Sequence, residues 1–152
     1  MSASAPAHGF VAPVCDEDAL PFYRFAREGR LCLPRCADTG RWIFPPRPLS
    51  PFGPAHTRRA PVWEEVSGRG AIWSFVVPHP PLLPAFAERL PLVVALVALE
   101  EDATVRLAGT LVGPGGAPLA EADVAGVRIG APVRVAFERM DDEWTLPRWE
   151  LA

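Results

Sequence analysis

The sequence contains no lysine, so arginine supplies all 15 of its basic side chains. Arginine keeps a fixed charge and suits bidentate contacts with phosphate groups. Acidic residues outnumber the arginines, and the net charge is −3. This charge argues against broad binding to nucleic acids or to anionic membranes.

Cysteine is also scarce, with only Cys15, Cys32 and Cys36 in 152 residues. An odd number this small makes a poor disulfide framework. The longest apolar run, Leu90–Leu99, is too short to span a bilayer. The first residues lack a basic region followed by an apolar core, so they do not predict a secretory signal. We therefore expect a cytoplasmic protein with reduced thiols.

The segment Asp18–Gly29 predicts a short helix after a proline-containing N-terminal arm. Asp18 can cap it, Pro21 is tolerated in a first turn, and Gly29 can end it. Phe22 and Phe25 fall on one apolar face of this helix. A helix this short needs a surface to dock on, which is either the rest of this chain or a partner protein.

Alternating and β-branched residues between glycine, proline and aspartate predict several strands. We interpret the first two runs as one long strand bent at Gly68 and Gly70. This gives five antiparallel strands and an OB-type barrel, a mainly β fold. The segment Leu119–Pro132 is predicted as a loop with at most one turn of helix. The runs are Val62–Val66, Ala71–Val77, Leu92–Glu100, Thr104–Val112, Val133–Met140 and Trp144–Leu151.

Cys32 and Cys36 raise the question of a metal site. Structural zinc needs four ligands, usually from two turns that each supply a pair. Asp38 and His56 could complete a site with these two cysteines. Nothing in the sequence supplies a second cysteine pair, so we favour the alternative, which is two half-buried thiols in a small ribbon.

Three stretches carry a family resemblance. They are "EGRLCLPRCADTGRWIFPPRPLSPFG" from Glu28, "WEEVSGRGAIWSF" from Trp63 and "VRIGAPVRVAFE" from Val127. The chain from about residue 18 to 152 resembles the OB-fold family with an N-terminal rubredoxin-like zinc ribbon, the acyl-CoA-associated "domain of unknown function thirty-five". The resemblance implies an arm at 1–17, a helix at 18–30, a ribbon at 31–60 and an OB fold at 61–152.

The family pattern implies cysteines at four positions, where this sequence has Cys36, Thr39, Ser50 and Gly53. Hydroxyl groups are poor zinc ligands, and glycine offers no side chain. We therefore expect a degenerate, ordered ribbon without zinc and without any other cofactor. Prolines that restrict the unfolded chain and an apolar miniature core would hold it together.

The resemblance also implies a function. Family members resemble partners of thiolase-like and hydratase-like enzymes, so we expect a non-catalytic accessory subunit that helps position acyl-CoA or acyl substrates. A homo-oligomer is also possible, and neither nucleic acid nor membrane is expected as a partner. Aromatic and arginine side chains suit protein interfaces, and arginine suits the phosphates of CoA. The candidate contact residues are Phe22, Phe25, Arg35, Arg41, Trp42, Phe44, Arg47, Phe52 and His79.

Two other functions have less support in the sequence. A single-strand nucleic-acid binder needs aromatics and cations on one barrel face, but Trp73 and Phe75 share strand parity and are predicted as core. An independent acyl-CoA thioesterase or hydrolase needs a nucleophile beside a base. The sequence offers His8, His56 and His79 as bases but no credible catalytic constellation.

Overall fold

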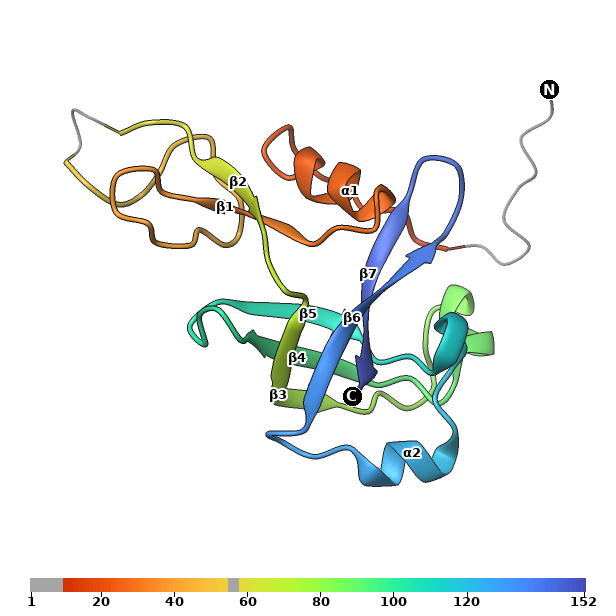
Figure 1. Ribbon diagram of the computed structural model, residues 1–152. Helices are drawn as coiled ribbons and strands as arrows, with labels where there is room; N and C mark the ends of the chain where they lie inside the picture. The colour runs from red at the N-terminus through yellow and green to blue at the C-terminus, as the bar shows by residue number, and fades with distance from the viewer. Residues whose placement is uncertain (1–9, 55–57) are drawn as a thin grey trace.

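The computed structural model describes residues 10–54 and 58–152 (Figure 1). His8, His56 and part of the predicted arm therefore lie outside the described residues. Two β-sheets and a short helix, α1, make up most of the structure (Figure 1). None of the helices in these ranges has the length and apolar character needed to cross a membrane.

The larger sheet contains β3 (Arg69–Val76), β4 (Val94–Leu99), β5 (Arg106–Thr110), β6 (Pro132–Arg139) and β7 (Thr145–Leu151). Its strand order is β5-β4-β3-β6-β7, and every neighbouring pair is antiparallel. The sheet curls until Leu111 forms a bridge with Trp149, and the Val112 N–H donates to the Trp149 carbonyl at 2.8 Å. The prediction of a five-stranded OB-type fold is confirmed as a curled half-barrel.

The concave side of this half-barrel holds the core. Along β4 the side chains alternate between half-buried and buried, so one face of the strand lines the core. Trp149 is the largest fully buried side chain, with 1% of its surface exposed. Other core members from the sheet are Ile72, Ala95, Val97, Leu107 and Val133.

The prediction of one long strand running from Val62 through Gly68 is wrong. The run Val62–Glu65 is β2, which pairs antiparallel with β1 (Cys32–Arg35) in a separate two-stranded sheet. Gly68 has φ of +71°, and Val135 of β6 packs against its backbone. The chain changes direction at this glycine, so β2 leaves the half-barrel before β3 begins.

Helix α1 (Leu20–Arg27) lies between the two sheets and contacts β1, β6 and β7 (Figure 1). Its apolar face thus docks on the same chain. Pro21 lies in the first turn and Gly29 follows the helix at φ +72°, as predicted. Asp18 does not cap the helix, because the Asp16 carboxylate accepts the Ala19 N–H at 3.0 Å.

Short helical turns complete the fold. They are η2 (Pro84–Arg89), η3 (Pro114–Gly116) and α2 (Glu121–Gly126). Helix α2 takes up six residues of the segment Leu119–Pro132, about 1.7 turns at 3.6 residues per turn, so the helix is longer than the single turn expected there.

Gly109 lies where the half-barrel closes, and we expect the stability of the fold to be sensitive to its substitution. A Cβ atom on Gly109 would come within 2.8 Å of the Trp149 ring, which is fully buried. We expect Gly109→Ala to lower the free energy of unfolding by about 1–3 kcal/mol, because the core must shift to accept it. Urea denaturation measures this change. Gly126→Ala is the control, since nothing lies within 4 Å of its Cβ position. Equal stability of the two variants would contradict the proposed closing contact.

Candidate functional site

The ribbon contains two turns at the positions where the family resemblance implies zinc ligands. In the first turn the Gly40 N–H donates to the Cys36 carbonyl, and the Cys36 N–H donates to the Arg41 carbonyl, both at 2.8 Å. In the second, the Ser50 hydroxyl oxygen accepts the Phe52 N–H at 3.1 Å. Backbone hydrogen bonds and side-chain acceptors thus shape both turns.

Three of the four implied ligand positions still converge. The side chains of Cys36 and Ser50 are buried, at 2% and 3% exposure. Hydrogen bonds from the Ser50 hydroxyl, and then from the Thr39 hydroxyl, lower the pKa of the Cys36 thiol from 9.0 to about 7. Gly53, the fourth position, has φ of +88° and no side chain to contribute.

This donor set does not fit tetrahedral zinc, because it offers one thiol and two neutral hydroxyls. In residues 10–54 and 58–152, no group of three His, Cys, Asp or Glu side chains is placed to hold a metal ion. Cys32 is buried in β1, and burial raises the pKa of its thiol. Cys32, Cys36 and Asp38 therefore do not form a site together, and His56 lies outside the described residues.

The predicted contact residues of α1 and the ribbon meet in part. Phe22 lies 6.3 Å from Phe44 and 5.2 Å from Tyr23, and Tyr23 lies 5.2 Å from Trp144, between ring centroids. We call these four side chains the aromatic row. It joins the ribbon, α1 and the start of β7, and geometries of this kind stabilise aromatic pairs.

The predicted contact residue Phe25 has partners outside the aromatic row. Phe25 packs on Trp63 at 5.8 Å, and the Arg30 guanidinium lies over the Phe25 ring at 5.2 Å. Sequence analysis missed Tyr23, Trp144 and the Phe25–Trp63 contact, because their partners are distant along the chain.

Two predicted arginines stack on predicted aromatics of the ribbon. The Arg35 guanidinium lies 5.0 Å from the Trp42 ring centroid, and the Arg41 guanidinium lies 3.8 Å from that of Phe52. Arg35 also donates to the Gly40 carbonyl at 2.6 Å. These arginines stabilise the ribbon, and such stacking is worth about 0.5–1 kcal/mol at exposed sites.

Arg47 and His79 stand apart from these contacts. Arg47 is exposed in the ribbon. His79 is exposed. It lines a pocket together with Leu90 and Glu121, which lie outside the ribbon. The structure does not bring His79 together with the ribbon candidates.

The prediction that Trp73 belongs to the core is wrong, whereas Phe75 does pack against the core. The pairing of β3 with β4 shifts between Ile72 and Ser74, and Trp73 is the extra residue at this irregularity. Its side chain is 48% exposed, with the Arg106 guanidinium 3.8 Å from the ring centroid. A bulge reverses strand parity, which a sequence pattern does not reveal.

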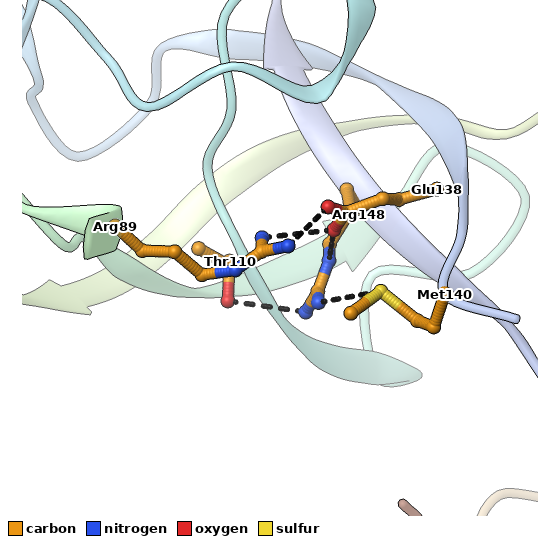
Figure 2. Close-up of polar contacts among 5 residues, drawn as sticks. All are labelled: Arg89, Thr110, Glu138, Met140 and Arg148. Carbon is orange, nitrogen blue, oxygen red and sulfur yellow. Dashed lines mark hydrogen bonds and ion pairs between the residues drawn. The ribbon is translucent and has the colours of Figure 1, made fainter. Parts of the chain in front are cut away.

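A polar cluster joins η2, β6 and β7 (Figure 2). The Glu138 carboxylate accepts from Arg148 Nε at 2.7 Å and from Arg89 Nη1 at 3.0 Å, with a further contact from Arg89 Nη2. Arg148 Nη1 also donates to the Thr110 hydroxyl at 3.3 Å. Burial alone would raise the pKa of Glu138, but the two guanidinium groups outweigh it and the pKa is lowered.

Family models match both parts of the chain. Residues 25–49 match "ChsH2, rubredoxin-like zinc ribbon domain", a match that ends before Ser50 and Gly53. Residues 63–138 match "ChsH2, C-terminal OB-fold domain". These regions define an OB-fold protein with an N-terminal ribbon. The chain belongs to the DUF35/ChsH2 family.

Two curated relatives are hydratase subunits. One is the 3-oxo-4,17-pregnadiene-20-carboxyl-CoA hydratase alpha subunit of Mycobacterium tuberculosis, 37% identical over 91% of this chain and 39% of that protein. The other is a probable enoyl-CoA hydratase alpha subunit of Thermomonospora curvata, 34% identical over 89% of this chain and 38% of that protein. This chain thus spans about two fifths of the length of these relatives.

Two solved structures are similar to this chain. A chain described as "Ltp2-ChsH2(DUF35) aldolase" has a TM-score of 0.74 and 33% identity, over 92% of this chain and 98% of that one. A DUF35 family protein of unknown function from Sulfolobus solfataricus has a TM-score of 0.51 and 14% identity, over 87% and 83%. The second likeness concerns the fold alone.

We propose that the ribbon folds without zinc. We therefore expect a chelator to leave the melting temperature of the natural chain unchanged. The triple variant Thr39→Cys, Ser50→Cys, Gly53→Cys should take up zinc, because zinc binding of about 10–16 kcal/mol exceeds the strain of a non-glycine residue at positive φ.

Metal analysis of both purified chains tests this proposal, and Cys36→Ser in the triple variant is the control that should lose the metal. Stoichiometric zinc in the natural chain would overturn the proposal and return attention to Cys32, Cys36 and His56.

The cluster in Figure 2 predicts a pH-dependent contribution to stability. Glu138→Gln should lower the free energy of unfolding by about 2–4 kcal/mol at neutral pH, because two half-buried guanidinium groups lose their carboxylate. A lowered carboxyl pKa stabilises the fold above the ordinary value of 4.5 and loses that effect as the pH falls. The deficit of the variant should therefore shrink in acid.

Urea unfolding at neutral and acidic pH measures this deficit. Glu64→Gln is the matched control, because Glu64 pairs with Arg35 at 2.8 Å but is 45% exposed. We expect this control to cost less than about 1 kcal/mol. A deficit of Glu138→Gln that is as small, or that does not change with pH, would contradict the prediction.

Proposed function

We propose that this chain is a non-catalytic accessory subunit that binds a hydratase-like or thiolase-like enzyme and helps position its acyl-CoA substrate. One observation carries this proposal: 33% identity to the "Ltp2-ChsH2(DUF35) aldolase" chain over 98% of its length. The hydratase alpha subunits among the curated relatives support the same class of complex. The relatives' names supply the acyl-CoA substrate class, and the thiolase-like alternative follows from the family resemblance.

The described residues support a partner-dependent role better than independent hydrolysis. The Cys36 thiol has a lowered pKa, but its hydrogen-bond partners are the hydroxyl groups of Ser50 and Thr39 and the backbone of Thr39 and Asp38, none of which is a general base. His79 is exposed, and no hydrogen bond or ion pair joins it to another described residue. A thioesterase needs a nucleophile and a base within hydrogen-bond reach. We infer that the partner supplies the catalytic groups.

Nucleic-acid binding has less support. Trp73 under Arg106 is a stacking pair on the outside of the half-barrel. Single-stranded nucleic acids are bound by several stacking positions along a basic groove. The net charge is −3, and in the described half-barrel Trp73 and Arg106 form the one such pair, because the other stacked arginines lie on the ribbon or beside α1; the requirement is therefore not met.

The exposed side of the ribbon is the surface we assign to the enzyme partner. Phe44, Leu49 and Val62 are 38%, 50% and 51% exposed. Arg41 and Arg47 lie on the same ribbon and are also exposed. Apolar side chains with arginine neighbours are typical of protein interfaces, and the guanidinium groups suit CoA phosphates.

Co-purification tests the proposal. The tagged chain should bring down a hydratase-like or thiolase-like enzyme in fixed stoichiometry when the two are produced together. Leu49→Asp should weaken the complex about tenfold or more, because a desolvated carboxylate would enter the interface.

Ile129→Asp is the matched control for Leu49→Asp. Ile129 is 69% exposed and lies between α2 and β6, at the end of the half-barrel away from the ribbon (Figure 1). It should leave binding unchanged. Acyl-CoA hydrolysis by the isolated chain, or equal affinities of both variants, would contradict the proposed role or the proposed surface respectively.

A further inference from the structure

A pocket of about 280 Å³ opens where α1 lies over β5 and β7. Phe22 and Tyr23 of α1 form one wall, Ala108 of β5 another, and Leu146 and Trp149 of β7 a third. The pocket contains none of the ribbon residues discussed above. Its volume is close to the lower end of the roughly 300–1,000 Å³ typical of ligand pockets, so it suits a small ligand.

The polar side chains among the described lining residues can all donate hydrogen bonds. They are Arg148, Tyr23 and Thr110, and none of the described lining residues carries a carboxylate. Burial is the main reason why the pKa of Tyr23 is raised, so its phenol keeps its proton at neutral pH. The pocket therefore favours an apolar ligand with acceptor oxygens.

The Arg148 guanidinium has N–H groups that take no part in the hydrogen bonds of the cluster. Its side chain is only 14% exposed, and it donates hydrogen bonds to Glu138, to Thr110 and to the weakly accepting sulfur of Met140 (Figure 2). A guanidinium carries five N–H groups, so further donors have no acceptor within residues 10–54 and 58–152.

The net charge of the cluster also favours a ligand with acceptor oxygens, and in particular an anion. Arg89 and Arg148 share the one carboxylate of Glu138, so the three side chains together carry one net positive charge. A second carboxylate, bound from the pocket side, would balance this charge and use the free guanidinium donors in the geometry that arginine prefers.

We propose that this pocket binds a small apolar monocarboxylate, with the carboxylate on Arg148 and the hydrocarbon body between α1 and β7. The proposal does not depend on an enzyme partner, because every group it uses belongs to this chain.

Isothermal titration calorimetry on the full chain with three probes of equal chain length tests the head group. Octanoate should bind more tightly than 1-octanol, and octylammonium should bind weakest, because the cluster repels a cation. Equal affinities for the three probes would show unspecific hydrophobic binding and overturn the proposal. Binding of octanoyl-CoA without binding of octanoate would also overturn it, since the site would then belong to the thioester.

Two variants separate the polar and apolar parts of the site. Arg148→Met should reduce octanoate affinity roughly tenfold to a hundredfold while barely changing 1-octanol binding. Ala108→Phe fills the pocket from an exposed strand position and should abolish binding of all probes while leaving the Glu138 cluster in place. This second variant decides the question even if Arg148→Met fails to fold.

Arg134→Met is the control. Arg134 is 67% exposed and pairs with Glu150 outside the pocket. It should bind octanoate as the natural chain does. Unchanged octanoate binding in Ala108→Phe, or an equal loss in Arg134→Met, would overturn the assignment of the ligand to this pocket.

Discussion

The contact between β5 and β7 at Trp149 is the constraint on which the rest of the structure depends. The curled sheet can close only where its first and last strands meet, and the Trp149 ring fills that junction against Gly109. Because neighbouring residues of a strand point to opposite faces, burying Trp149 turns Arg148 outward to Glu138 and Thr110. One strand therefore closes the core with one residue and builds the proposed anion site with the residue before it.

In the proposed zinc-free ribbon, other interactions would hold the two turns in place of a metal. Hydroxyl groups at two ligand positions hydrogen-bond the remaining thiol, and arginines stack on Trp42 and Phe52 nearby. Each such contact is worth about 1 kcal/mol or less, far below the free energy of a structural zinc. A ribbon held in this way depends on its docking to the half-barrel, which the aromatic row supplies through Phe44, Phe22 and Trp144.

The sequence predicted those features of the fold that depend on residues close together along the chain. The alternation of the run that forms β5, the proline and glycine at the two ends of α1 and the number of barrel strands were all correct. The pairing of β2 with β1 was missed because it joins Glu65 to Cys32 across a proline-rich loop. The exposure of Trp73 was missed because one extra residue in β3 reverses the parity. Glu138 and Arg89 are 49 positions apart, a separation at which periodicity carries no information.

The two candidate surfaces meet different physical requirements, which argues that they serve different ligands. The ribbon face is exposed and carries arginines that are already stacked or solvated, so it can contribute to a wide interface in which no single contact dominates. The pocket beside Arg148 has a volume of about 280 Å³ between α1, β5 and β7, which suits a small ligand. Helix α1 walls the pocket and also contacts β1 of the ribbon, so the two surfaces adjoin one structural element but differ in size, exposure and charge.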